Sequence, residues 1–191
     1  MAKSLSTIIR FIPNSTKTTQ VKSSIMHNNN TQRILIFGNA GSGKTTLAKN
    51  YADKHDLPHL DLDELAWLDT KIPERKPLKE SARLINAFVK KNKSWVIEGC
   101  YSDLLDLLES IATKMIFLNP GVDTCISNCK ARPWEPHKYK TAEAQNKNLG
   151  MLLQWVSDYP VREDEFSLSA HKALFERFKG NKIERTSNER K

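Results

Sequence analysis

The segment from Gly38 to Thr45 constrains this chain more than any other. It reads GNAGSGKT, a full match to the pattern GxxxxGK[ST], and it lies between an apolar run at 34–37 and a helical pattern at 45–55. Glycines at these positions let backbone N–H groups turn inward around phosphate oxygens, and the following helix adds the positive end of its dipole. The pattern therefore predicts a triphosphate-binding loop after a buried strand, within an α/β fold.

The residues of this loop have separate expected tasks. Lys44 is expected to reach the β- and γ-phosphates, and the hydroxyl of Thr45 is expected to ligate Mg²⁺, so ATP and Mg²⁺ are the predicted cofactors. A glycine-rich turn that binds nothing is the alternative, and the strand and helix on either side disfavour it. The predicted nucleotide-binding set is Gly38, Asn39, Ala40, Gly41, Ser42, Gly43, Lys44, Thr45 and Thr46.

Short apolar runs alternate with amphipathic segments along the rest of the chain. Strands are expected at 34–37, 60–62, 95–97, 115–118 and 182–185, and helices at 45–55, 78–91, 102–112, 123–132, 142–158 and 168–178. This alternation predicts a three-layer α/β fold, in which a parallel sheet of about five strands has helices on both faces. We expect one domain at 32–188, with the polar, proline-interrupted stretch 132–147 forming a helical lid.

The N-terminal residues 1–31 differ in composition from this domain. They contain no Asp or Glu and are rich in Ser, Thr and Lys, which predicts a disordered leader. The same composition also suits a mitochondrial transit peptide, which would place the protein in the mitochondrial matrix. An ordinary leader, or a functional start at Met26, is the alternative that we favour because the segment contains little arginine.

Charge and cysteine usage narrow the possible partners and compartment. The net charge is +8, but residues 53–178 hold 18 Lys or Arg against 20 Asp or Glu, so the excess lies near the ends and nucleic acid is a disfavoured partner. No apolar run approaches the roughly 20 residues that span a bilayer. The three cysteines match neither a disulfide set nor a metal pattern, which favours a cytoplasmic protein, and Cys125 and Cys129 are expected to be buried.

Two aspartates lie at the end of the second expected strand. Asp61 and Asp63 alternate in the run HLDLDE, so on an extended strand both would point toward the edge where ligands bind in parallel sheets. One carboxylate would then hold Mg²⁺, and the other would accept the proton of a hydroxyl group. An acidic loop that caps the next helix is the alternative.

Glu98 and Arg132 are the remaining charged residues that are expected at the nucleotide site. Glu98 ends the third expected strand, where a carboxylate can either hold the metal or cap the helix that begins near Ser102. Arg132 opens the proline-rich stretch after a helix, where a mobile cation would stabilise a transferring phosphate. A simple surface position is the alternative for Arg132.

Several other side chains are open to more than one interpretation. Trp67 is expected either in the core or in the wall of an acceptor pocket. Arg75 and Arg162, each near a proline, are either solvated loop residues or contacts for an anionic acceptor. The histidines form no spaced ligand set, and we expect His59, His137 and His171 to be ordinary polar residues.

Together these segments resemble the adenylate kinase and shikimate kinase group of P-loop kinases, which includes small bacterial proteins labelled topology modulation protein. The resemblance covers about 33–187 and rests on GNAGSGKTT, HLDLDELAW, WVIEGCYSDLL, IFLNPG and KARPW. It implies that Asp61 and Asp63 contact metal and acceptor, and that Arg132 contacts ATP phosphates. The segment VIEGCYSDLL lacks both the Gly-Gly-Gly turn of shikimate kinases and the Gly-[Phe/Tyr]-Pro-Arg element of adenylate kinases, so neither substrate is indicated.

The expected function is ATP-dependent phosphoryl transfer to a small-molecule acceptor, with no membrane partner. Lys44, Asp63 and Arg132 are the predicted catalytic residues, and Thr45, Asp61 and Glu98 are the predicted metal ligands. One alternative is an ATPase that switches a binding partner, and another is a nucleic-acid end kinase. The segment Asn146-Lys147-Asn148-Leu149 lacks the aspartate of a guanine-reading NKxD motif, which favours ATP over GTP.

Overall fold

A computed structural model describes residues 31–70, 73–135 and 140–187. The expected leader at 1–31, apart from Thr31, lies outside the described residues, as does His137. Residues from Thr31 onward belong to one compact unit. Within the described residues, no helix is both long enough and apolar enough to cross a membrane.

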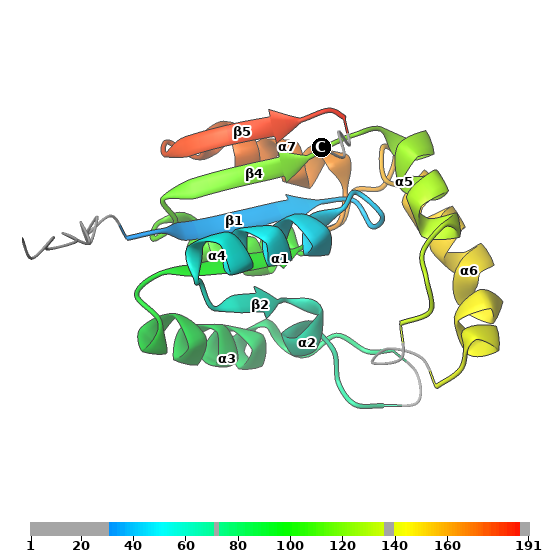
Figure 1. The fold of residues 1–191 in the computed structure, drawn as a ribbon, viewed down its shortest axis with the longest axis horizontal. Coiled ribbons are helices and arrows are strands. Elements are labelled where there is room, and N and C mark those ends of the chain that lie inside the picture. Colours follow the sequence, from blue (N-terminus) through cyan, green and yellow to red (C-terminus); the bar gives the residue numbers. More distant parts are fainter. Residues whose placement is uncertain (1–30, 71–72, 136–139, 188–191) are drawn as a thin grey trace, which may run out of the picture. The chain divides into compact units, whose positions relative to one another are not determined.

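The centre of this unit is a parallel sheet with the strand order β2-β3-β1-β4-β5 (Figure 1). Its strands are β1 (Arg33–Gly38), β2 (His59–Asp61), β3 (Trp95–Gly99), β4 (Lys114–Leu118) and β5 (Asn181–Arg185). Because the two strands beside β1 are β3 and β4, the carboxyl ends of β3 and β4 lie on either side of the loop that follows β1. The sheet thus brings segments far apart in sequence to one edge.

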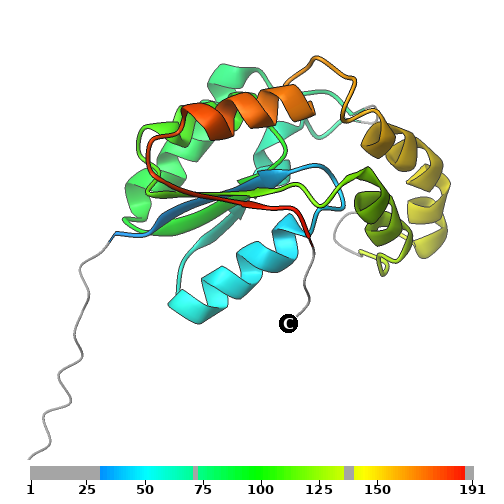
Figure 2. The ribbon, with the colours of Figure 1, turned by 90° about the horizontal axis from the view of Figure 1, so that it is seen from above.

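Helices cover both faces of the sheet, so the predicted three-layer fold is confirmed (Figure 2). In Figure 2, α1 lies on one side of the sheet, and α4 and α7 lie on the other. The helices are α1 (Lys44–His55), α2 (Asp63–Ala66), α3 (Leu78–Lys91), α4 (Ser102–Glu109), α5 (Val122–Lys130), α6 (Ala142–Ser157) and α7 (Leu168–Arg177).

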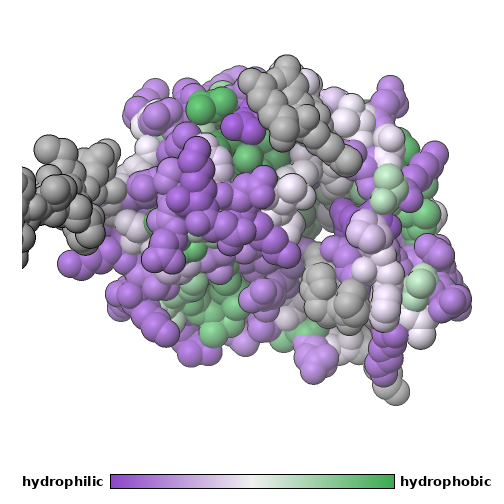
Figure 3. Space-filling model, in the orientation of Figure 1, coloured by the Kyte–Doolittle hydropathy of each residue, from purple (hydrophilic) through white to green (hydrophobic). Residues whose placement is uncertain are grey.

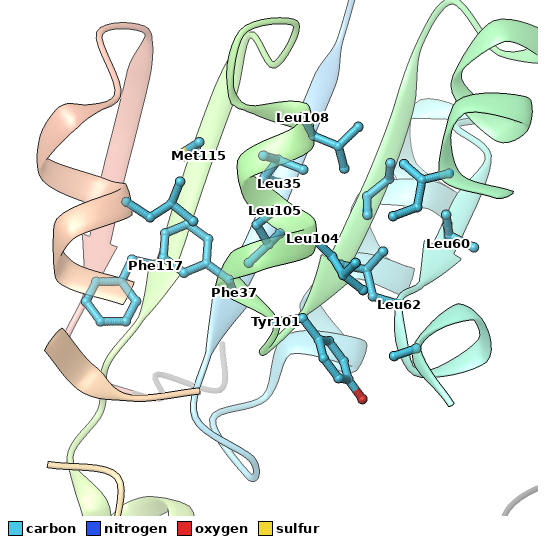
Figure 4. Close-up of a cluster of buried hydrophobic side chains, with 14 of the residues drawn as sticks. Leu35, Phe37, Leu60, Leu62, Tyr101, Leu104, Leu105, Leu108, Met115 and Phe117 are labelled. Atoms are coloured by element: carbon cyan, nitrogen blue, oxygen red, sulfur yellow. The ribbon is translucent and has the colours of Figure 1, made fainter. Parts of the chain in front are cut away.

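The alternation of side chains along β1 explains why both faces are covered. Leu35 and Phe37 join the large cluster beneath α4 and α7, part of which is drawn in Figure 4. Ile34 and Ile36 join a second cluster with Ala48 of α1. A strand that is apolar on both sides is typical of a parallel sheet between two helical layers. The outer side of α1 is polar, and the face seen in Figure 3 is largely hydrophilic.

Most expected elements are present, and two differences affect the site. The strand β2 ends at Asp61, and Asp63 begins the short helix α2, which the sequence analysis did not predict. The helix α5 ends at Lys130, so Arg132 lies beyond it, at the start of the stretch 132–147 that is expected to form a lid. The expectation that Asp61 and Asp63 share one face of a strand is therefore wrong, because the chain has already turned into α2 at Asp63.

Candidate functional site

The loop between β1 and α1 has the backbone geometry of a phosphate cradle. Gly38, Gly41 and Gly43 have φ values of 145°, 76° and 93°, which side chains rarely allow. In the described part of the chain, no side chain caps the N-terminus of α1, which begins at Lys44. Its first-turn N–H groups are therefore available to an anion, and the helix dipole favours negative charge there.

The helices α5 and α6 support this loop from behind. Asn128 of α5 donates a hydrogen bond from Nδ2 to the carbonyl oxygen of Gly41 at 2.8 Å. Asn39, which is buried, donates from Nδ2 to the carbonyl oxygen of Val156 in α6 at 3.0 Å. The first bond holds the backbone of Gly41 and the second holds the side chain of Asn39, so both helices are tied to the loop.

The expected burial of the two helical cysteines is confirmed, and the structure gives a reason for it. Cys125 and Cys129 are almost completely buried and form a small cluster that includes Val156 and Ala40 of the loop. Burial raises the pKa of Cys125 to about 11, which keeps the thiol protonated. These cysteines therefore act as small apolar packing residues between α5 and the loop.

The carboxylates meet the loop at the ends of β2 and β3. In the register of these strands Asp61 lies opposite Glu98, and the side chain of Glu98 is 1% exposed. Burial raises the pKa of Glu98 to about 7. Lys44 and a hydrogen bond with Thr45 oppose this rise, whereas Asp61 and Asp63 add to it. The other four predicted groups thus all lie close enough to influence the carboxyl group of Glu98, and their catalytic and metal-binding roles stay predictions.

The short helix α2 explains how Asp61 and Asp63 come together. The backbone N–H of Asp63 donates to Oδ1 of Asp61 at 2.9 Å, which stabilises the turn from β2 into the helix. The N-cap of α2 is Leu62 and, among the described residues, no side chain caps this helix, so Asp61 holds the turn before it and is not its cap. Glu98 shows no capping role either, because within the described residues no side chain caps the N-terminus of α4.

A hydrogen-bonded pair that the sequence analysis did not identify lies beside Asp63. Tyr101 donates from Oη to Oδ1 of Asp63 at 2.6 Å, and Trp67 donates from Nε1 to Oη of Tyr101 at 2.7 Å. Burial is the largest cause that raises the pKa of Tyr101, so its hydroxyl stays protonated. Trp67 had two open interpretations, and it proves to be a half-buried residue that packs against the core. The feature of the sequence that could have pointed to Tyr101 is its position, two residues after the end of β3.

Arg75 and Arg162 are neither solvated loop residues nor open anion contacts in this structure. Arg75 forms ion pairs with Asp103 at 2.9 Å and with Glu165 at 2.7 Å. Its guanidinium also lies over the ring of Tyr101, 4.7 Å from the centroid. Arg162 lies over Trp155 at 3.4 Å and pairs with Asp164 at 3.0 Å. Arg75 thus joins distant segments of the chain beside Tyr101, whereas the contacts of Arg162 are with residues near it in sequence.

Arg132 lies in the loop that follows α5. Its Nη1 forms an ion pair with Oε2 of Glu135 at 3.2 Å, and Glu135 in turn donates its backbone N–H to Gln145 of α6 at 2.8 Å. Cys129, three residues earlier, packs against Gly41 of the loop. Arg132 thus follows a residue that borders the loop, and its contact with phosphate remains a prediction.

The residues at the cradle fit a Mg²⁺ ion held jointly with phosphates. Oε1 of Glu98 is buried without a hydrogen-bond partner among the described residues, and the Thr45 hydroxyl lies beside this carboxyl group. Within the same residues no group of three or more His, Cys, Asp or Glu could hold a metal alone. That donor set suits Mg²⁺, which usually keeps water and phosphate ligands next to one or two carboxylates.

The histidines take different positions from one another. His59 Nε2 lies 3.9 Å from Glu98 Oε1, beyond hydrogen-bond distance, and burial lowers its pKa. His171 is fully buried, with Nε2 3.0 Å from the carbonyl oxygen of Cys100 and Nδ1 2.8 Å from the hydroxyl of Tyr159. The expectation of an ordinary polar residue is thus wrong for His171, which links α7 to the segment after β3.

The cradle, the parallel sheet and the carboxylates at its edge define a P-loop nucleotide-binding protein of the NTPase class. Residues 14–111 match the NB-ARC domain, and this match spans half of the chain. The chain belongs to the NB-ARC domain family. The matched residues include the cradle, Asp61, Asp63 and Glu98, and they end before Arg132. The expected P-loop resemblance is confirmed at the level of this class.

The chain is also similar to individual proteins. It is 25% identical over 130 residues to the uncharacterized protein YqaC of Bacillus subtilis, which covers 67% of this chain and 72% of YqaC. A gluconokinase structure from Sinorhizobium meliloti has a TM-score of 0.49 and 15% identity over 80% of this chain and 81% of its own. A sugar kinase structure from a Janibacter species has a TM-score of 0.45 and 16% identity over 81% and 86%. The names gluconokinase and sugar kinase describe the activities of those two proteins.

Proposed function

We propose that this chain is an ATP-dependent phosphotransferase that moves the γ-phosphate of MgATP to a hydroxyl group of a small-molecule acceptor. The observation that carries the proposal is the gathering of Lys44, Thr45, Asp61, Asp63 and Glu98 where β1, β2 and β3 end. A carboxylate that holds Mg²⁺ serves any P-loop NTPase. A further carboxylate beside it can accept the proton of a hydroxyl group, which supports phosphoryl transfer to such an acceptor.

Each residue has a defined part in this reaction. Thr45 and Glu98, with Asp61, would hold Mg²⁺, which neutralises charge on the β- and γ-phosphates when it is bound with ATP. Lys44 would stabilise the charge on the γ-phosphate oxygens as they move. Its Nζ now donates to the carbonyl oxygen of Asn39 at 3.0 Å, a bond that a phosphate oxygen can replace.

Asp63 would be the general base. It would take the proton of the acceptor hydroxyl while the acceptor oxygen forms its bond to the γ-phosphorus. The bond from that phosphorus to the β-phosphate oxygen breaks in the same step, and ADP leaves. Arg132 would exchange Glu135 for the transferring phosphate when the lid closes, which adds positive charge and excludes water.

The first test is a transfer screen with γ-labelled ATP and nucleoside monophosphates, nucleosides, sugars and sugar acids as acceptors. We expect label in one acceptor class, and we expect Lys44→Ala to abolish it. Lys49→Ala is the matched control, because Lys49 is an exposed lysine of the same helix. Transfer that survives in Lys44→Ala would contradict the assignment of the loop.

The second test addresses the base. Asp63→Asn is expected to lower kcat for transfer by about 10² to 10⁴ while ATP binding is retained, because the amide cannot accept the proton. Asp53→Asn, at an exposed position of α1, is the control for the loss of one carboxylate. Equal transfer by Asp63→Asn and wild type would eliminate Asp63 as the base.

The family match supports a second candidate, an ATPase that acts without a metabolite acceptor. It predicts label in free phosphate at a rate that no acceptor changes. In that case Lys44→Ala would still abolish turnover, and Asp63→Asn would affect only hydrolysis. The same screen thus separates the two functions.

A further inference from the structure

Tyr101 lies directly between a tryptophan and the proposed base. Its Oη is 2.7 Å from Nε1 of Trp67 and 2.6 Å from Oδ1 of Asp63. The indole nitrogen can only donate, so Oη accepts from Trp67 and must direct its own hydrogen toward Asp63. Figure 4 shows the Tyr101 hydroxyl oxygen pointing away from the labelled leucines of the core. Because the indole nitrogen is only a donor and the phenol has a single hydrogen, the donor and the acceptor of both bonds are fixed.

The ring that carries this hydroxyl is held on several sides. Tyr101 is 2% exposed, and its ring meets Phe166 edge to face at a centroid distance of 5.2 Å. Arg75 lies over the ring at 4.7 Å and is itself held by Asp103 of α4 and by Glu165. A side chain fixed by packing and by partly buried ion pairs presents its hydroxyl at one position.

Asp63 depends on such a partner because of where it stands in the chain. It is the first residue of α2, a helix of four residues, and its backbone N–H is held by Asp61 at 2.9 Å. That bond fixes the main chain and leaves the rotation of the Asp63 carboxylate to be set by side-chain contacts. A general base must present its oxygen in one orientation, and a displacement of about 1 Å can lower a rate by about 10².

We propose that Tyr101 is a positioning residue whose hydroxyl holds the carboxylate of Asp63 in the orientation that takes the acceptor's proton. Trp67 completes the arrangement by holding the Tyr101 hydroxyl. This inference rests on the proposed phosphotransferase function. It goes further because it assigns a role to two aromatic residues to which the proposed function gives none.

Tyr101→Phe is the sharpest test, since it keeps the ring beneath Arg75 and removes only the hydroxyl. We expect kcat for transfer to fall by about 10 to 100-fold, while the KM for the acceptor and the Kd for ATP stay within about twofold. Trp67→Phe removes the second hydrogen bond and is expected to lower kcat in the same way by a smaller factor. Tyr51→Phe is the matched control, because the hydroxyl of Tyr51 bonds Lys114 at 3.1 Å instead of a site residue.

The outcomes separate this inference from the proposed function. Wild-type transfer with an unchanged kcat in Tyr101→Phe overturns the positioning role and leaves the phosphotransferase intact. Loss of ATP binding together with kcat in Tyr101→Phe also overturns it, because that result means general loss of structure. Absence of transfer in the wild type overturns the proposed function, and the inference with it. A fall in kcat alone, shared by Trp67→Phe and not by Tyr51→Phe, supports it.

Discussion

Replacement of Gly41 by alanine tests whether α5 holds the phosphate cradle. A Cβ atom at Gly41 would lie 2.4 Å from the carbonyl oxygen of Cys125 and 2.7 Å from Sγ of Cys129, and the residue has φ +76°. The left-handed backbone costs a non-glycine residue about 1 to 3 kcal/mol, and the overlap with α5 adds about 1 to 3 kcal/mol. We therefore expect Gly41→Ala to lower the free energy of unfolding by about 2 to 6 kcal/mol.

Two other glycines separate these contributions. Gly121 also has a positive φ, +88°, which L side chains rarely adopt, but a Cβ there meets nothing within 4 Å. Gly121→Ala should therefore lose only the conformational part, about 1 to 3 kcal/mol. Gly150 lies within α6 and also has open space around its Cβ position, so Gly150→Ala should gain about 0.5 to 1 kcal/mol from helix propensity.

The assay is urea denaturation of all three variants without nucleotide, followed by ATP binding. The expected order of unfolding free energy is Gly150→Ala above wild type, then Gly121→Ala, then Gly41→Ala. Only Gly41→Ala is expected to weaken ATP binding as well, since the displaced backbone belongs to the cradle. If Gly41→Ala is as stable as Gly121→Ala, α5 does not pack against the loop and the reasoning is refuted.

Two further predictions concern groups buried around the site. Burial lowers the pKa of His171 to about 4, against 6.5 in the unfolded chain. Lys44 also lowers it, whereas the bond to the Cys100 carbonyl and Asp164 raise it. As the pH falls, the unfolded state therefore binds the proton before the folded state does. The free energy of unfolding should fall by about 3 kcal/mol between pH 6.5 and pH 4. Denaturation measured across this pH range should show a smaller fall for His171→Gln. Ser81 donates to the Leu65 carbonyl at 2.8 Å while fully buried, so Ser81→Ala should cost about 1 kcal/mol in the same assay.

The elements of the fold were largely predictable because their signals are local. The apolar run before Gly38 needs cover on both faces, and this follows from its composition alone. The helix at Leu78–Lys91 was predicted with both ends correct, because apolar residues recur at helical spacing between Pro77 and Asn92. The four-residue helix α2 was missed, since so short a segment has no periodicity to detect.

The site was predictable only in part, because its contacts are not local. Alternation along a strand suggested the wrong reason for the closeness of Asp61 and Asp63, which depends on a turn instead. Arg75 had two open interpretations, and neither foresaw its ion pairs with Asp103 and Glu165, which lie 28 and 90 residues away in the chain. Pairing at such separations follows from how helices pack, and no sequence spacing encodes it.

The sequence by itself determined the cradle. Glycine spacing, a lysine and a hydroxyl residue between a strand and a helix form one continuous segment, whose backbone geometry follows from local preferences. Only the tertiary structure decided what surrounds it. The parallel pairing of β2 with β3 puts Asp61 opposite Glu98, and the packing of Tyr101 against Arg75 brings its hydroxyl to Asp63. These contacts join residues dozens of positions apart, so they exist only once the chain has folded.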